Sequence, residues 1–249
     1  MTQKKTIGIV AGLNRRAATE VKTQLLAQGG DDITVMMTED NFKIDPDPTF
    51  AVSDRKIFIF NESELLAEMG VDLILVPDFK CGSYIHEIQR EIQTPILDMK
   101  GALMSQMGEG APAMGVLDAA NAAGCTDGAC DISKQMKLIF PTEEEDKALN
   151  EIREKVRAEG ASDEAAQKLA EVCKSLMAKG AQVIVPNCTQ FALNVPALQA
   201  MGLPVMNVFE VFAKAALAHS TKKLPKPFKL GLIGGLGPAA TVDLYDKIV

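Results

Sequence analysis

Residues 70–77 read GVDLILVP, and residues 180–186 read the similar GAQVIVP. In both segments a glycine precedes a nearly all-apolar run that ends at a proline, which is typical of a parallel strand buried on both faces. Pro95 follows Pro77 after 18 residues, and Pro204 follows Pro186 after the same interval. The repeat predicts a unit of helix end, buried strand, loop, helix and proline-led strand, present twice in the chain.

Short apolar runs and longer amphipathic ones alternate outward from this repeat, as in an α/β fold. We expect two pseudo-symmetric lobes, each a parallel sheet flanked by helices, with an active-site cleft between the lobes. Ligands of open α/β sheets bind at the carboxyl ends of the strands, which is why the equivalent loops are expected to face one cleft. The other strands are predicted at 6–11, 32–37, 114–117 and 137–140. Four helices are predicted: one at 16–28, one that begins with a cap at 61–64 and ends at Gly70, one that begins at Thr142, and one that runs from Ser162 to Gly180.

The expected lobe boundaries follow from a second repeat. Residues 8–19 (GIVAGLNRRAAT) reappear with one residue fewer at residues 231–241 (GLIGGLGPAAT), after the linker-like stretch KKLPKP at 222–227. We expect the first lobe at 1–100 plus 208–222, the second at 101–207, and at 223–249 a linker and the truncated start of a second tandem copy. The alternative is that the last strand and helix dock onto this copy.

Composition narrows the class of protein. Of the 249 residues, 26 are Lys or Arg and 33 are Asp or Glu, and aromatic residues make up 5% with no Trp. A net charge of -7 without a basic stripe argues against a nucleic-acid or anionic-membrane surface. No apolar stretch approaches the roughly 20 residues of a membrane span. The five cysteines are therefore interpreted as reduced thiols of a cytoplasmic protein.

Cys188 is the cysteine whose position suggests chemistry. It lies in PNCTQ (186–190), directly after a buried strand and before a helix, where backbone N–H groups and the helix dipole lower a thiol pKa. The alternative is a small buried core residue. Cys173 shares a helix face with Leu169, Val172 and Leu176, which favours a core position.

Metal binding is the weaker interpretation of the other polar clusters. Cys125 and Cys130 flank TDGA but lack two further ligands, and the chain has only His86 and His219. The acidic residues 143–146 are better explained as the first turn of a helix, where the macrodipole favours negative charge. We therefore expect no metal.

Asp78 is the predicted counterpart of Cys188. Counted from Gly70 and Gly180, Asp78 and Cys188 both lie eight residues on, whereas a count from the prolines would make Phe79 the counterpart. Cys81 fits neither count. The alternative for Asp78 is an N-cap of the following helix, which carries Ile85, Ile88 and Ile92.

Several motifs resemble those of the aspartate/glutamate racemases. GGLGPAATVDL (234–244) looks very like the opening of these enzymes, and Asp54-Arg55 resembles their Asp-Arg pair. VPDFK (76–80) stands where the family has its first catalytic Pro-Cys-Asn-Thr loop. FPTEEE (140–145) resembles the segment that begins the second-lobe helix, and NCTQ (187–190) resembles the second catalytic Gly-Cys-Thr-Glu motif. The resemblance covers most of residues 6–220.

The resemblance implies racemisation without a cofactor, in which two thiols act on opposite faces of a substrate α-carbon. Here Asp78 replaces the first cysteine, Asn14-Arg15 replaces Gly-Pro in the opening loop, and Gln190 replaces the family glutamate. A carboxylate is a weaker base than a thiolate, and a nearby one opposes formation of the Cys188 thiolate. The implied catalytic residues are Cys188 and Asp78, and the implied substrate-binding residues are Gly12, Asn14, Arg55, Lys80, Asn187, Thr189 and Gln190.

Three functions remain open at this point. The chain is a racemase-type enzyme with Asp78 or a shifted Cys81 opposite Cys188, a single-thiol enzyme resembling arylmalonate decarboxylases, or a ligand-binding half of a tandem protein whose next copy is active. The expected partner is a small carboxylate or amino acid, for which Arg15, Arg16, Arg55 and Lys80 are candidate cations. The resemblance also suggests a homodimer or a tandem partner domain.

Overall fold

Strand β3 (Leu73–Val76) lies inside a parallel sheet of order β2-β1-β3-β4, with β1 at Lys5–Ile9, β2 at Ile33–Met37 and β4 at Ile96–Asp98. The computed structural model describes residues 4–39, 52–82, 84–106, 112–118 and 137–225. Leu73 and Leu75 belong to one hydrophobic cluster, and Ile74 and Val76 to another on the opposite face. The strand is therefore buried on both faces, as its apolar run predicts.

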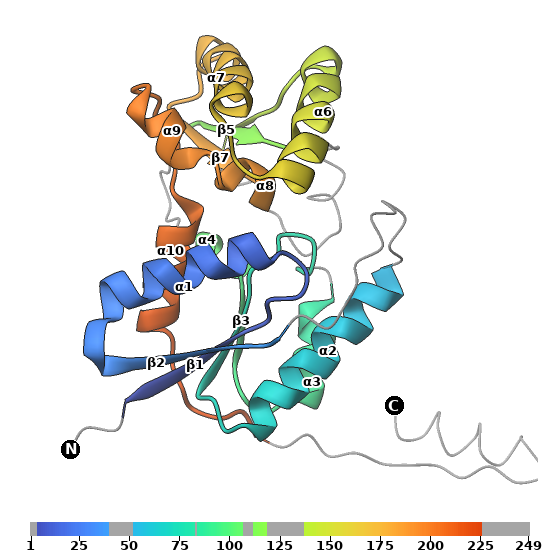
Figure 1. The fold of residues 1–249 in the computed structure, drawn as a ribbon, viewed down its shortest axis with the longest axis vertical. Coiled ribbons are helices and arrows are strands. Elements are labelled where there is room, and N and C mark those ends of the chain that lie inside the picture. Colours follow the sequence, from blue (N-terminus) through green and yellow to red (C-terminus); the bar gives the residue numbers. More distant parts are fainter. Residues whose placement is uncertain (1–3, 40–51, 83, 107–111, 119–136, 226–249) are drawn as a thin grey trace, which may run out of the picture.

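Helices cover both faces of this first sheet (Figure 1). Helices α1 (Arg15–Gly29), α4 (Met99–Gln106) and α10 (Val208–Ala218) contribute to the cluster that holds Leu73 and Leu75. Helices α2 (Val52–Glu68) and α3 (Ile85–Glu91) contribute to the cluster that holds Ile74 and Val76. A 3-10 turn at Gly30–Asp32 links α1 to β2.

The second sheet has the order β6-β5-β7 and is also parallel, with β5 at Met114–Leu117, β6 at Leu138–Ile139 and β7 at Val183–Pro186. A single parallel bridge from Ile184 to Val205 stands where a fourth strand is expected. Helices α6 (Glu143–Glu159), α7 (Asp163–Ala178), α8 (Thr189–Ala192) and α9 (Val195–Ala200) belong to this lobe. Ile184 points into its core, while Val183 and Val185 join the cluster shared with the first lobe.

The backbone hydrogen bonds of the two lobes repeat each other. The Asp72 amide donates to the Thr6 carbonyl at 2.8 Å, and the Gln182 amide donates to the Ala113 carbonyl at the same distance. Ile74 and Ile184 donate at 2.9 Å to Pro95 and Pro204 respectively. The repeat at 70–77 and 180–186 is therefore a structural repeat, and its register runs from the glycines.

One predicted helix start is wrong. α2 begins at Val52, so residues 61–64 lie inside the helix and do not cap it. Phe58 and Ile59 already pack against the first sheet upstream of this point, and Ser63 is fully buried. Tertiary packing thus extends the apolar helix face beyond the local capping signal.

The predicted starts of α6 and α7 are confirmed. Thr142 and Glu145 form a reciprocal capping box, in which the Glu145 amide donates to the Thr142 hydroxyl and the Thr142 amide donates to the Glu145 carboxylate. The Ser162 hydroxyl accepts from the Ala165 amide at the start of α7. The acidic residues 143–146 thus form a helix first turn, as expected.

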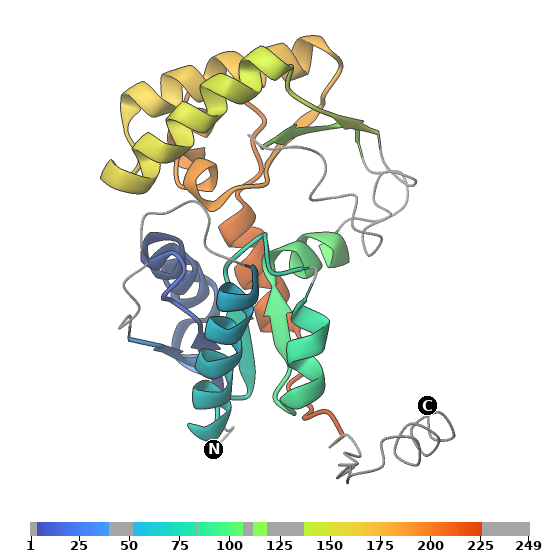
Figure 2. The same cartoon turned by 90° about the vertical axis from the view of Figure 1, so that its right-hand side faces the viewer.

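Figure 2 shows the second lobe standing over the first, and the two lobes contact each other through a shared core and through polar side chains at the start of α1. The Asn14 amide donates to the Thr189 hydroxyl at 2.8 Å. The Arg16 guanidinium donates to the carbonyls of Val156, Arg157 and Ala158 at the end of α6. A cation at a helix C-terminus is favoured by the macrodipole, so this contact ties α1 to the second lobe.

Some expectations fall outside the described residues, namely Cys125, Cys130 and the start of a second copy after residue 225. Within the residues that are described, no helix combines the length and hydropathy that crossing a membrane requires.

Candidate active site

Asp78 and Cys188 occupy equivalent positions after β3 and β7. Leu75 pairs with Ile9, and Val185 pairs with Val116, so each strand lies beside the strand that opens its lobe. Because the repeat keeps this register from the glycines, Asp78 corresponds to Cys188, and the count that would select Phe79 does not apply. Both residues lie at the carboxyl ends of parallel strands, where α/β folds bind ligands.

Cys188 is a half-buried residue at the N-terminus of α8. Its Sγ donates to the Gln190 side-chain carbonyl oxygen at 2.9 Å. Burial raises the pKa of Cys188 to about 11, and the backbone amides of Gln190 and Phe191 lower it by less than burial raises it. The expectation of a lowered thiol pKa is therefore wrong, because α8 has only four residues and desolvation of the thiolate outweighs its amides.

Alkylation of Cys188 by iodoacetamide is expected to be slow at pH 7 and to accelerate about tenfold per pH unit before levelling off near pH 11. The reason is that the thiolate is the reactive form, and a raised pKa leaves little of it at neutral pH. Mass spectrometry of the Cys188 peptide over a pH series checks this. A plateau already reached near pH 7 would contradict the buried, protonated thiol.

Polar residues that the sequence analysis singled out surround this thiol. The Asn187 side-chain amide donates to Asp118 Oδ2 at 2.7 Å, and Gln190 Oε1 accepts from the Thr189 hydroxyl at 3.2 Å as well as from Cys188. Asn14 reaches the same group from the first lobe through Thr189. The structure thus brings together Asn14, Asn187, Cys188, Thr189 and Gln190.

Asn14→Ala is expected to destabilise the fold by about 1–3 kcal/mol. The substitution removes the acceptor of the Ala17 amide at the N-terminus of α1 and the hydrogen bond to Thr189 in the other lobe. Asn207→Ala is the matched control, because Asn207 caps α10 through the Glu210 amide. Urea denaturation of both variants measures the difference, and equal losses would show that the bond between the lobes contributes nothing.

Asp78 has a different environment from Cys188. Its Oδ2 pairs with Arg55 Nη1 at 2.6 Å, and its Oδ1 accepts from the Lys80 amide. The alternative role of Asp78 as an N-cap is wrong, since Tyr84 is the residue before α3 and Asp78 pairs with Arg55 on α2. The Lys80 side chain is exposed.

Cys81 and Gly12 have packing roles. Cys81 is fully buried and its Sγ donates to the Asp78 carbonyl at 3.1 Å, and burial raises the pKa of its thiol well above the usual range. A Cβ at Gly12 would come within 2.3 Å of the Phe58 ring, so this turn needs glycine for close packing. Cys173 is likewise buried in the second-lobe core, as expected.

Two charged residues in the surroundings of Cys188, Asp118 and Arg153, are not among the site residues predicted from the sequence. The charge of Asp118 raises the pKa of the Cys188 thiol and that of Arg153 lowers it. Arg153 lies one residue after the buried Ile152 and four after the buried Leu149, so a cation at the edge of an apolar helix face is the signal that could have found it. Asp118 directly follows β5, at the carboxyl end of a strand in the same sheet as β7.

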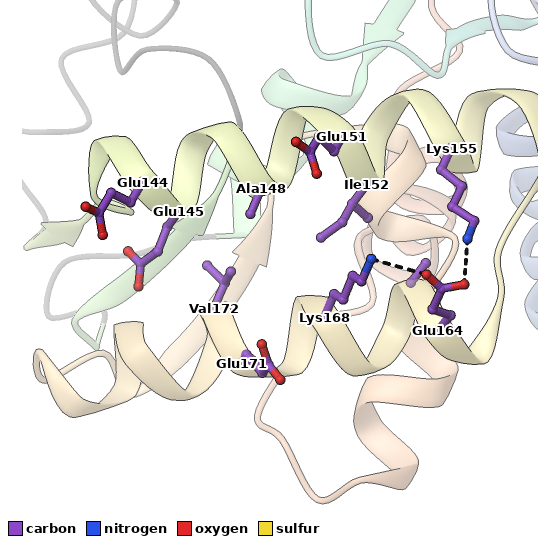
Figure 3. A pocket seen from close by; sticks show the side chains of 11 residues that line it. Glu144, Glu145, Ala148, Glu151, Ile152, Lys155, Glu164, Lys168, Glu171 and Val172 are labelled. Carbon is purple, nitrogen blue, oxygen red and sulfur yellow. Dashed lines mark hydrogen bonds and ion pairs between the residues drawn. The ribbon is translucent and has the colours of Figure 1, made fainter.

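A surface groove of about 600 Å³ lies elsewhere, between α6 and α7 (Figure 3). Glu164 pairs there with both Lys155 and Lys168, and none of the expected site residues lines the groove. In the described ranges, no group of three or more His, Cys, Asp or Glu side chains is arranged to hold a metal ion.

Comparison with known proteins identifies the fold. No known family model matches the sequence. The aspartate racemase of Picrophilus torridus aligns with a TM-score of 0.67 at 16% identity, over 89% of this chain and 96% of that one. An aspartate racemase homologue from Pyrococcus horikoshii gives 0.66 at 17% identity, over 86% and 98%. The allantoin racemase of Klebsiella pneumoniae gives 0.61 at 12% identity, over 92% and 96%. The expected two-lobed racemase fold is thereby confirmed.

Proposed function

We propose that this chain, which shares its fold with aspartate and allantoin racemases, carries out cofactor-independent acid–base chemistry at the α-carbon of a carboxylate-bearing substrate of the aspartate or glutamate class. The observation that carries the proposal is the equivalence of Asp78 and Cys188. Each lobe presents one proton-transferring side chain after its buried strand, at the same position in the repeat. Such an arrangement suits attack on opposite faces of one carbon.

The protonation of the two groups assigns them different roles. Cys188 holds its proton at neutral pH because its pKa is raised to about 11, so it serves as the acid. Asp78, whose Oδ2 pairs with the Arg55 guanidinium, serves as the base. Asp78 takes the α-proton, Cys188 delivers its own proton to the other face, and both groups return to their starting forms by exchange with water. A carboxylate is a weak base for a carbon acid, so proton removal is the slow step.

Incubation with both enantiomers of aspartate and glutamate in heavy water tests the proposal. The expected result is deuterium at the α-carbon of the inverted enantiomer. Chiral chromatography separates the two enantiomers, and mass spectrometry measures the deuterium content of each. Thermal stabilisation by these amino acids without any exchange would instead indicate a ligand-binding protein.

The neutral thiol also favours a second candidate function. A protonated Cys188 is suited to protonating, from one face, a carbanion formed by loss of carbon dioxide from a substituted malonate. Decarboxylation of an arylmalonate, with a single enantiomer as the product and no amino-acid exchange, would select this candidate over racemisation.

A further inference from the structure

Arg153 on α6 is a charged side chain that lacks a full set of partners. Only 18% of the side chain is exposed, and its Nη2 donates to Asn150 Oδ1 at 2.5 Å. Its Nε is buried and has no hydrogen-bond acceptor in the described part of the chain. Glu154 Oε1 stands 3.6 Å from this Nε, beyond hydrogen-bond distance, and Arg157 pairs with the other Glu154 oxygen.

This guanidinium belongs to the surroundings of Cys188. Helix α6 packs against α8, which begins directly after Cys188, and the positive charge of Arg153 acts on the thiol. Asn187, adjacent to Cys188, is held by Asp118 on the other side. The thiol thus lies within electrostatic reach of a cation on the neighbouring helix that retains a buried donor.

The cations expected from the sequence either pair with other groups or belong to the first lobe. Arg16 donates to three carbonyls at the end of α6, and Arg55 pairs with Asp78 in the first lobe. Lys80 also belongs to the first-lobe loop, and both Lys80 and Arg15 are exposed. Of these cations and Arg153, Arg153 is the one whose charge lowers the pKa of the Cys188 thiol.

We propose that Arg153 binds the carboxylate of the substrate beside Cys188. A guanidinium presents parallel N–H donors that match the two oxygens of a carboxylate, and a buried donor without an acceptor is costly until such an anion arrives. The substrate class is then a small acid whose reacting carbon lies next to the bound carboxylate, within reach of the thiol. The catalytic meaning of this site rests on the proposed function, but anion binding itself does not.

Alkylation of Cys188 by iodoacetate and by iodoacetamide at one pH tests this site without requiring turnover. The two reagents differ by a carboxylate in place of a neutral amide. We expect iodoacetate to be favoured at Cys188, with a rate that saturates and is inhibited competitively by acetate but not by acetamide. If the alkylation rate rose linearly with iodoacetate concentration and acetate did not lower it, the proposal would be overturned, and this test needs no variant.

Variants locate the effect. Arg153→Met is expected to lower the iodoacetate-to-iodoacetamide rate ratio at the Cys188 peptide by about tenfold or more. Arg153→Lys is expected to restore part of it, because the charge is kept and the planar fork is lost. Arg157→Met is the control, since Arg157 contacts the same Glu154 but is 40% exposed. An unchanged ratio in Arg153→Met would overturn the assignment.

The two proposals fail in different ways. If Arg153→Met loses the preference while the wild type exchanges no α-proton in heavy water, the carboxylate site stands and the proposed function falls. If exchange occurs but iodoacetate is not favoured, the proposed function stands and another residue binds the carboxylate.

Discussion

Replacing Cys188 by alanine is expected to lower the rate of α-proton exchange by at least about 100-fold. Alanine removes Sγ, the proton donor that the proposed reaction needs after β7, while the backbone of residue 188 keeps its place at the start of the short helix α8. The loss of Sγ also frees Gln190 Oε1, which still accepts from Thr189. The rate is measured as deuterium gained at the α-carbon per unit time.

Two further variants show whether the loss comes from the thiol or from packing. Cys173→Ala removes the same atom from a fully buried position in the second-lobe core and is expected to lower stability while leaving the exchange rate per folded molecule unchanged. Cys188→Ser keeps the size and polarity of the side chain but supplies a much weaker acid, so it should resemble alanine. Exchange that survives in Cys188→Ala would remove Cys188 from the reaction.

Leu75→Ala is expected to lower the free energy of unfolding by about 2–5 kcal/mol. Leu75 is fully buried in β3, where it packs into the cluster that joins the first sheet to α1, α10 and residues of the second lobe. The cavity left in this cluster is surrounded on all sides, so little of it can collapse.

Leu65→Ala is the matched control for this change. Leu65 lies on α2 with 47% of its surface exposed, so the same deletion is expected to change stability by no more than about 0.5 kcal/mol. Denaturant titrations give both values. If Leu75→Ala and Leu65→Ala lowered the free energy of unfolding by similar amounts, β3 would not be the buried core strand described above.

The sequence predicts the elements whose signals are local. The apolar runs of β3 and β7 are enough to predict two buried strands, because a strand buried on both faces admits few polar residues. Their register is not, because the counts from the glycines and from the prolines differ by one residue and the backbone hydrogen bonds decide between them. The capping signals at Thr142 and Ser162 also correspond to real helix starts. Asn61 and Ser63 carry a similar signal, yet α2 runs through them because its earlier residues are held by packing on the sheet.

The site is predictable in its positions and less so in its chemistry. The glycine count places Asp78 opposite Cys188 in the repeat, but the sequence does not reveal that Arg55 pairs with Asp78 or that burial raises the thiol pKa. Both depend on contacts between segments far apart in the chain. Arg153 is not predicted because a charged residue on an amphipathic helix ordinarily faces solvent.

The most direct test of the proposed acid–base chemistry is the α-deuterium content of aspartate and glutamate after incubation in heavy water with the wild-type protein and with Cys188→Ala, side by side. We expect deuterium at the α-carbon with the wild type and its near-complete loss in the variant. Absence of deuterium from both enantiomers of both amino acids with folded wild-type protein, or equal incorporation by the two proteins, would contradict the proposed chemistry.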